Sequence, residues 1–288
     1  MIHVAGQNGE KVGWKVAETL RDGVYRAYLD FVETAEKKRR WNIFDDIPWG
    51  AIDPEIVSEE NARAIEIFCS EELYVPDYSA KGLALVRPGF GLTWFQMSWA
   101  QEEARHGLVF REYLTRSGLR TDAQFAAFEA KIFGHAWELP FATARQMACY
   151  GALQEGATFI AYKAQRAMAR AAEDPVLAAI FHLVGRDEAA HGGFYRAVIG
   201  LELLEDRAGT VADLARVVTE FKMPGDGLIA DYRERLKSSG AGISPRTFVE
   251  HVVWPLLTML NIERREFKQA MKLRPAIEPI PAAEESVV

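Results

Sequence analysis

The sequence predicts an all-α protein, built as one helical bundle with added helices. Apolar residues recur at helical spacing through almost every long segment, and no stretch alternates in the way a strand does. Asp174-Pro175 and Ser244-Pro245 each place a capping side chain before a proline suited to the first helical position. No repeat or linker divides the chain. We therefore expect a single domain over residues 1–272 and a disordered tail over residues 273–288, which are rich in proline, glutamate and alanine.

Each predicted helix rests on a local pattern. The first is indicated by apolar residues that share one face, Val16, Leu20, Val24, Ala27 and Phe31. Pro76 is expected to end the second helix, and a loop with Pro88, Gly89 and Gly91 to precede the third. In chain order, helices are expected over about residues 12–40, 54–74 and 92–117, after Asp122, over about 138–171, from Pro175 onwards, and over about 208–222, 225–237 and 245–272.

Composition narrows the class of protein. Hydrophobic residues make up 49% of the 288 residues and charged residues 26%, values typical of a soluble globular protein. The chain contains no apolar run of about 18 residues or more, so we expect no membrane span, and its net charge of -7 argues against nucleic-acid binding. Residues 1–15 lack the pattern of a targeting segment, and Cys69 and Cys149 lie in apolar helical stretches. We therefore expect a cytoplasmic protein with buried, reduced cysteines.

Two Glu-x-x-His motifs carry the clearest chemical signal: Glu103-Ala104-Arg105-His106 and Glu188-Ala189-Ala190-His191. Residues three apart lie on one face of an α-helix, so each motif directs a carboxylate and an imidazole to the same point. Each histidine is followed by glycine and bulky apolar residues, which a solvated helix face would not carry. Iron and manganese accept such mixed ligands. A pair of these motifs, with a glutamate from each of two other helices, holds two metal ions inside a bundle.

The chain also offers the two further glutamates. Glu155 shares a helix face of little other charge with Met147, Gly151, Thr158 and Tyr162. A charge there is costly unless it is paired or bound to metal. Glu72 is the other candidate, although periodicity does not separate it from Glu71. An interior salt bridge for Glu155, or a hydrogen-bonded core histidine for either His alone, is the ordinary alternative; the two motifs together favour the metal site.

Several segments match the motifs of a known family. Residues 99–107 read Trp-Ala-Gln-Glu-Glu-Ala-Arg-His-Gly, close to Trp-x-x-Glu-Glu-Asn-Arg-His-Gly, and residues 154–160 read Gln-Glu-Gly-Ala-Thr-Phe-Ile, close to Gln-Glu-Arg-Ala-Thr-Phe-Ile. Residues 187–191 read Asp-Glu-Ala-Ala-His, close to Asp-Glu-Lys-Arg-His. Residues 71–78 resemble a segment whose iron ligand lies four residues before Pro-x-Tyr, and Trp41, with Asp45 and Pro48, resembles Trp-x-x-x-Asp-x-x-Pro. From about residue 41 to about residue 224 the chain thus resembles the soluble acyl-acyl-carrier-protein desaturases.

This resemblance implies a ferritin-like four-helix bundle with additional N- and C-terminal helices. It implies an O2-dependent di-iron desaturase that introduces a double bond into a fatty acyl chain bound to an acyl carrier protein. A ferredoxin-type electron donor and a homodimeric assembly are implied as well. The Pro-x-Tyr offset selects Glu72. The two iron ions would then be held, with Glu103 and Glu188 bridging, by Glu72, Glu103, His106, Glu155, Glu188 and His191.

Three more residues have roles that the resemblance implies. Trp41 is implicated in electron entry, Thr158 in passing protons during the reaction, and Asp187 in orienting a ligand histidine through its ring N–H. For Thr158 a hydroxyl bonded to the carbonyl four residues back is an equal alternative, and Asp187 is equally well interpreted as only a polar neighbour.

Departures from the family pattern bear on the substrate. Gly156 replaces an arginine and Ala189-Ala190 replace Lys-Arg, and small residues beside the ligands could widen the cavity. A di-iron oxygenase acting by hydroxylation or N-oxygenation would use the same ligands. A ferritin-like iron-storage or peroxide-scavenging protein and a non-catalytic helical interaction protein are further candidates. The basic run Lys37–Arg40 is a candidate docking surface for an acidic carrier or ferredoxin, although such a run at a helix end often only favours the helix C-terminus.

Overall fold

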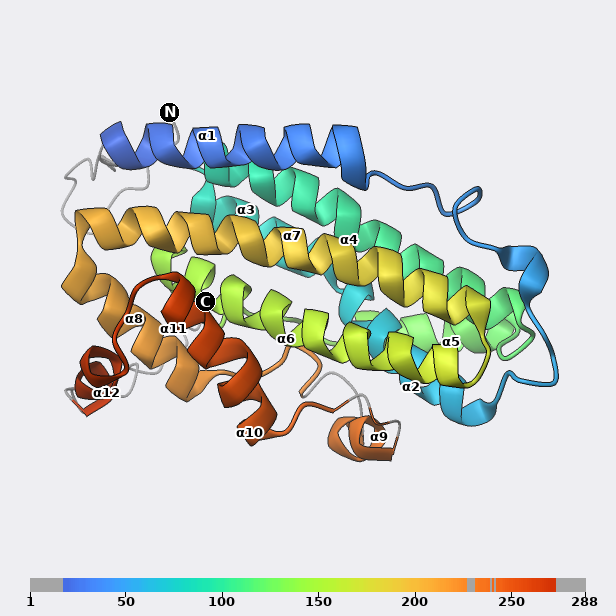
Figure 1. The fold of residues 1–288 in the computed structure, drawn as a ribbon. Helices are drawn as coiled ribbons and strands as arrows, with labels where there is room; N and C mark the ends of the chain where they lie inside the picture. Colours follow the sequence, from blue (N-terminus) through green and yellow to red (C-terminus); the bar gives the residue numbers. More distant parts are fainter. Residues whose placement is uncertain (1–17, 227–230, 239, 241, 273–288) are drawn as a thin grey trace, which may run out of the picture.

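The computed structural model describes residues 18–226, 231–238, 240 and 242–272, and this part of the chain is all-helical. Residues 12–17 of the expected first helix and the expected tail over residues 273–288 lie outside it. Four helices form the central bundle, α2 (Glu59–Leu73), α4 (Phe90–Arg116), α6 (Ala144–Ala171) and α7 (Pro175–Glu205), as Figure 1 shows. The predicted all-α bundle with added helices at both ends is confirmed.

Helix α1 (Glu18–Thr34) packs along both α4 and α7, and it continues into a π-helical turn, Ala35–Arg39 (Figure 1). The crossing with α4 is close because Gly91 has no side chain. A Cβ atom at Gly91 would lie 2.8 Å from the backbone nitrogen of Tyr25 and 2.9 Å from the carbonyl oxygen of Val24. Glycine therefore lets the two helix backbones approach each other.

The second helix ends at Leu73, close to the predicted Tyr74, but it starts later than predicted. It begins at Glu59 rather than near residue 54, because the Ser58 side chain caps it by accepting a hydrogen bond from the Asn61 N–H. The predicted helix does end before Pro76, but the prediction missed that helical structure resumes at once. After an interruption at Tyr74 a further helix, α3 (Val75–Val86), carries Pro76 in its first turn, where a missing N–H removes no intrahelical bond.

Capping side chains set the starts of the middle helices. Thr121 and Gln124 form a capping box at α5 (Asp122–Phe133). Thr143 caps α6, so this helix begins at Ala144 and not near residue 138. The start of α7 at Pro175, capped by Asp174, is confirmed.

The C-terminal part is more broken than predicted. Helix α8 (Arg207–Glu220) agrees with the prediction, and α9 (Tyr232–Ser238) is shorter than the expected 225–237. The expected single helix over 245–272 is wrong. It consists of α10 (Pro245–Phe248), a π-helical turn (Val249–Val253), α11 (Trp254–Met259) and α12 (Arg264–Lys272). Before α12 the chain turns at Asn261, which has a left-handed φ of 52° that stops a right-handed helix.

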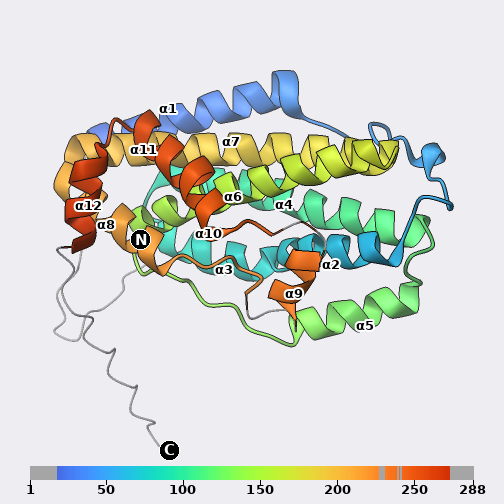
Figure 2. The ribbon, with the colours of Figure 1, turned by 60° about the horizontal axis from the view of Figure 1, so that its bottom comes forward.

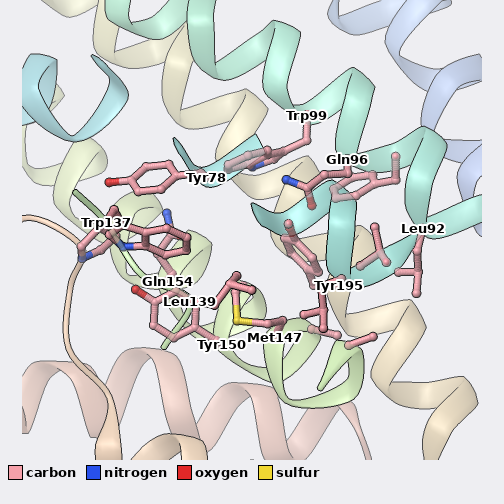
Figure 3. A pocket seen from close by; sticks show the side chains of 18 residues that line it. Tyr78, Leu92, Gln96, Trp99, Trp137, Leu139, Met147, Tyr150, Gln154 and Tyr195 are labelled. Atoms are coloured by element: carbon pink, nitrogen blue, oxygen red, sulfur yellow. The ribbon is translucent and has the colours of Figure 1, made fainter. Parts of the chain in front are cut away.

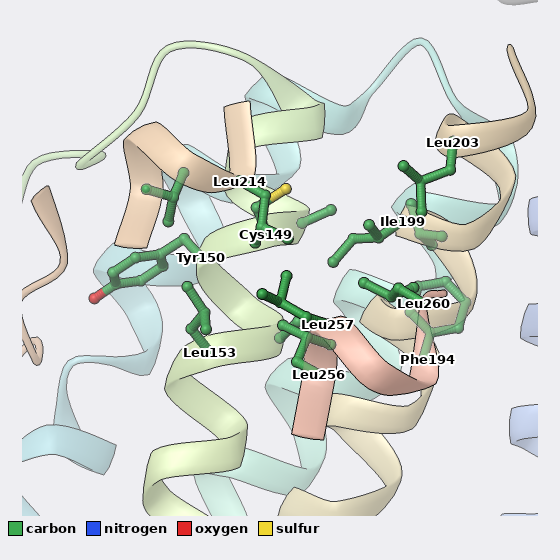
Figure 4. Close-up of a cluster of buried hydrophobic side chains, with 14 of the residues drawn as sticks. Cys149, Tyr150, Leu153, Phe194, Ile199, Leu203, Leu214, Leu256, Leu257 and Leu260 are labelled. Carbon is green, nitrogen blue, oxygen red and sulfur yellow. The ribbon is translucent and has the colours of Figure 1, made fainter. Parts of the chain in front are cut away.

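Two apolar clusters fill the bundle. One joins α1, the N-terminal halves of α4 and α6 and the C-terminal half of α7 to α8 and α11, and Figure 4 shows Cys149, Leu153, Ile199 and Leu257 in it. The other joins α2 to the opposite halves of α4, α6 and α7. Both cysteines are buried free thiols, as predicted. No helix in the described part of the chain has the length and apolar character needed to cross a membrane.

Figure 2, turned from the view of Figure 1, shows α3 and α5 beside the bundle and α8, α11 and α12 gathered at one end of it. The four bundle helices α2, α4, α6 and α7 therefore enclose the middle of the molecule, and the added helices cover its sides and one end.

Candidate metal centre

The structure brings all six predicted ligands together at the centre of the bundle. Potential ligand atoms of Glu72, Glu103, His106 and Glu188 lie within 4.8 Å of one another, and so do those of Glu103, Glu155, Glu188 and His191. All six side chains are buried. Glu103 and Glu188 belong to both groups, which is the position expected of bridging carboxylates. Two adjacent four-residue sites therefore share two members.

Glu72, and not Glu71, faces this cluster. The Glu72 carboxylate accepts a hydrogen bond from the Tyr162 hydroxyl at 2.7 Å and lies 4.0 Å from His106 Nδ1. The Glu71 carboxylate turns the other way and accepts hydrogen bonds from the Tyr232 hydroxyl and the Gly225 N–H. Burial raises the pKa of Glu71 to about 7, although these two donors oppose the shift.

The donor atoms of the cluster fit two divalent cations. Each histidine turns Nδ1 towards carboxylates: His106 Nδ1 lies 3.2 Å from Glu188 Oε1, and His191 Nδ1 lies 3.0 Å from Glu103 Oε1. Five buried atoms of the cluster have no hydrogen-bond partner among the described residues, namely Glu103 Oε1, Glu155 Oε2, both carboxylate oxygens of Glu188 and His191 Nδ1. Four carboxylates and two neutral imidazoles balance two divalent ions, and the donor types suit iron or manganese.

The protonation equilibria reflect the same excess of negative charge. Burial raises the pKa of Glu72 and of Glu155 well above the usual value, and neighbouring carboxylates add to the shift. Burial lowers the pKa of His106 and His191, but the surrounding carboxylates outweigh it and raise both pKa values. Without metal, protons therefore supply the positive charge that the buried carboxylates require.

A second layer of carboxylates holds the other ring nitrogen of each histidine. Asp187, on α7, lies 3.3 Å from Nε2 of His106, which is on α4. Glu102, on α4, lies 2.8 Å from Nε2 of His191, which is on α7. Each helix thus positions the histidine of the other, and the predicted orienting position of Asp187 matches this geometry.

Trp41 and Arg39 complete this layer. The Trp41 indole N–H donates to Asp187 Oδ2 at 2.7 Å. Arg39 Nη1 donates to Asp187 Oδ1 at 2.6 Å and to Glu102 Oε2 at 2.7 Å, so one buried guanidinium joins both carboxylates. The sequence analysis assigned no role to Glu102, and it considered Arg39 only as part of the basic run Lys37–Arg40. The available signal was the acidic residue that precedes the glutamate in both Glu-x-x-His motifs.

The predicted docking surface at Lys37–Arg40 is contradicted only for Arg39, and for the exposed Lys37 and Lys38 it stays a prediction. Arg39 is buried, Arg40 donates to Glu36, Gln101 and Glu102, and Lys37 pairs with Glu33. Arg39 and Arg40 therefore contact the carboxylates of the second layer, whereas Lys37 and Lys38 do not.

Thr158 lies near the cluster without contacting it. Its hydroxyl donates to the Gln154 carbonyl at 3.0 Å, which is the alternative bond expected of a helical threonine. Its role in proton transfer stays a prediction. Gly156 does not widen a cavity, contrary to expectation, because a Cβ atom there would lie 2.9 Å from Val252 Cγ1. The π-helical turn Val249–Val253 has taken up that space.

Two cavities flank the cluster along α6. The larger, about 870 Å³, reaches Ala157, Thr158 and Ala161 on one side of Glu155. The smaller, about 50 Å³, reaches Gly151 and Gln154 on the other side (Figure 3). We call them the proximal and the distal cavity.

Comparisons with known proteins agree with this geometry. The family model described as fatty acid desaturase matches residues 87–239, more than half of the chain. The chain belongs to this family. DesA1 of Mycobacterium tuberculosis, which is named as an acyl-[acyl-carrier-protein] desaturase, is 26% identical over 260 residues that cover 81% of this chain and 75% of the relative.

Solved structures show the same fold. DesA2 of Mycobacterium tuberculosis, named as an acyl-ACP desaturase, superposes with a TM-score of 0.62 at 20% identity, covering 88% of this chain and 99% of that one. A variant of an R2-like ligand-binding oxidase with a Mn/Fe cofactor gives a TM-score of 0.53 at 18% identity, covering 91% of this chain and 95% of that one. The ferritin-like fold and the family resemblance predicted from the sequence are thus confirmed.

Proposed function

We propose that this desaturase-family protein uses two iron ions and O2 to introduce a double bond into an acyl chain carried on an acyl carrier protein. The observation that carries the proposal is the buried cluster of four carboxylates and two histidines in a chain of this family. Glu72, Glu103, His106, Glu155, Glu188 and His191 would hold the ions, with Glu103 and Glu188 between them.

The overall reaction balances with an external reductant. The substrate loses two hydrogen atoms from neighbouring carbons, and a ferredoxin-type donor supplies two electrons. With two more protons from solvent, O2 becomes two water molecules. The bound iron would supply the oxidising power that breaks the two C–H bonds.

The protein's own residues would orient the centre and connect it to the donor. Asp187 and Glu102 fix the rings of His106 and His191. Trp41, Asp187 and His106 form a continuous hydrogen-bonded series that leads into the cluster, and we assign electron entry to it. The Arg105 guanidinium lies 5.3 Å from the centre of the Trp41 ring, in a cation–π contact.

The proximal cavity would hold the acyl chain on the carrier side. Its lining is largely apolar, with Phe68, Phe221 and Phe248 among the contacts, and its volume of about 870 Å³ lies within the range of ligand sites. Lys222 and Lys237 are exposed at its edge, and neither forms an ion pair with a described residue. On a chain of net charge -7 they form a local basic rim, which suits an acidic carrier protein.

Product analysis under ¹⁸O2 tests this function. Iron-loaded protein, a reductant and a panel of acyl-carrier substrates should give a product two mass units lighter than the substrate, without label. If every converted substrate instead gains a labelled oxygen, the protein is an oxygenase built on the same ligands. If peroxide or iron(II) is consumed with no acyl product from any substrate, a ferritin-like storage or scavenging function takes its place.

A further inference from the structure

The distal cavity lies one helical turn from two of the cluster residues. Gly151 precedes Glu155 by one turn of α6, and Tyr195 follows His191 by one turn of α7. Trp99 also lines the cavity, and its indole N–H donates to Glu155 Oε1 at 2.9 Å. A group bound here would therefore sit beside the metal centre, on the side of Glu155 away from the proximal cavity.

Aromatic side chains make the distal cavity narrow. The walls shown in Figure 3 include Tyr78, Trp99, Trp137, Tyr150 and Tyr195. The volume of about 50 Å³ compares with about 10–15 Å³ needed for a single water molecule. The cavity therefore has room for the end of a chain and not for a long alkyl tail.

Three polar side chains line this narrow space, and none of them forms a side-chain hydrogen bond with a described residue. Gln96 is 8% exposed, its amide points into the cavity, and it forms no hydrogen bond with any described residue (Figure 3). The Tyr78 hydroxyl is buried and has no partner among the described residues. The Gln154 side chain lines the same space, and within the described part of the chain it has no hydrogen-bonding partner.

Most of the lining is apolar, and an alkyl group placed against its few polar side chains would leave these without hydrogen bonds. Burying an amide or hydroxyl without a hydrogen bond costs about 1–3 kcal/mol for each group. Glutamine and tyrosine side chains can each donate and accept hydrogen bonds. They therefore suit a carbonyl oxygen, which accepts, or a hydroxyl group, which donates and accepts. A binding site that places unpaired polar groups in this way discriminates strongly against a ligand that lacks the matching function.

We propose that the distal cavity binds an oxygen function, a hydroxyl or a carbonyl, at the far end of the substrate's acyl chain. Gln96, whose amide points into the cavity, is its principal recognition residue, and Gln154 lines the same space. The inference rests on the proposed desaturase function and makes the substrate an oxygenated acyl chain in place of a plain fatty acyl chain.

Ligand binding to the iron-loaded protein tests the proposal without turnover. Fatty acids and their ω-hydroxy analogues of equal length, over a range of chain lengths, are titrated by calorimetry. At the length that fits, the ω-hydroxy acid should bind at least about tenfold more tightly than the plain acid. Gln96→Leu, which keeps the side-chain size, should remove that preference while the protein retains its iron, and Gln269→Leu on the surface of α12 should leave it unchanged.

Plain acids binding as tightly as ω-hydroxy acids at every chain length would overturn the proposal. Water would then satisfy the polar side chains of the distal cavity. A preference that survives in Gln96→Leu would overturn the assignment of Gln96. The measurements distinguish a failure of the proposed distal site from a failure of the proposed desaturase function. Desaturation of plain chains with no ω-hydroxy preference contradicts the distal site alone, whereas tight ω-hydroxy binding with no desaturated product contradicts the proposed function.

Discussion

Each histidine of the cluster is held by a carboxylate from the opposite helix. Asp187 reaches from α7 to His106, and Glu102 reaches from α4 to His191, while Arg39 binds both carboxylates. The six cluster residues would be neutral with two divalent ions, and the guanidinium offsets part of the charge added by the second layer. Buried charges at this density are tolerated because each one is paired or would bind metal.

Replacement of Glu72 and of Glu71 should have opposite consequences. Glu72→Ala removes a carboxylate that faces the cluster, so iron content should fall and turnover should be abolished. Glu71→Ala should keep both ions, although it should lower the free energy of unfolding by about 1–3 kcal/mol, because the Tyr232 and Gly225 donors lose their acceptor. Iron analysis and urea denaturation measure both effects. Loss of iron in Glu71→Ala with retention in Glu72→Ala would contradict the geometry.

The motifs predicted the members of the cluster but not the layer around it. Spacing alone places Glu103 with His106 and Glu188 with His191, because both members of each pair share one helix face. The contacts of Glu102, Asp187 and Arg39 cross between elements far apart in sequence, and no local pattern encodes them. Glu71 and Glu72 likewise differ only in the distant residues that they contact, so helical periodicity could not tell which one is the ligand. The family's Pro-x-Tyr offset selected Glu72.

Helix starts were predictable where a capping residue stands before proline, as at Asp174-Pro175. Breaks between consecutive helices were harder to predict. Pro76 is typical of a helix end, but it is equally compatible with the first turn of the next helix, and α3 was missed for that reason. The break at Asn261 depends on a left-handed residue that the sequence does not distinguish from an ordinary helical asparagine.

The close crossing of α1 and α4 at Gly91 predicts how a substitution there changes the stability of the protein. Gly91→Ala places a methyl group within 2.9 Å of the α1 backbone, which has no flexible atom to move aside. The free energy of unfolding should fall by about 1–3 kcal/mol. Gly200→Ala on α7 is the matched control: no atom lies within 4 Å of the added Cβ, and alanine should stabilise the helix by about 0.5–1 kcal/mol. Equal stability of the two variants in urea denaturation would show that the helices do not cross this closely.

On the scale of the whole molecule, an apolar patch covers the outer surface of α1 and α4. Tyr25, Leu29, Phe90, Trp94 and Met97 are between 40% and 59% exposed, and the Tyr25 and Phe90 rings lie 5.6 Å apart. Adjacent exposed aromatic side chains are typical of a protein interface. We propose that this patch joins two copies of the chain in the homodimer implied by the family resemblance.

Sedimentation at micromolar concentration should give about twice the monomer mass of 32.3 kDa. Trp94→Asp should shift the protein to the monomer, because it places a charge inside the proposed interface. Phe133→Asp is the control, since Phe133 is 47% exposed at the end of α5, which lies across the bundle from α1 (Figure 2). A wild-type protein that sediments as a monomer would refute the dimer, and a Trp94→Asp dimer would refute this interface.

The most direct test of the account is the iron content of four proteins loaded under identical anaerobic conditions. Wild-type protein should hold two iron ions per chain. His106→Ala and His191→Ala should each lose iron, because removal of one ligand leaves buried carboxylates without compensation. His182→Ala, which changes an exposed histidine on α7, should keep both ions. Two ions per chain in both His106→Ala and His191→Ala would contradict the six-residue metal centre.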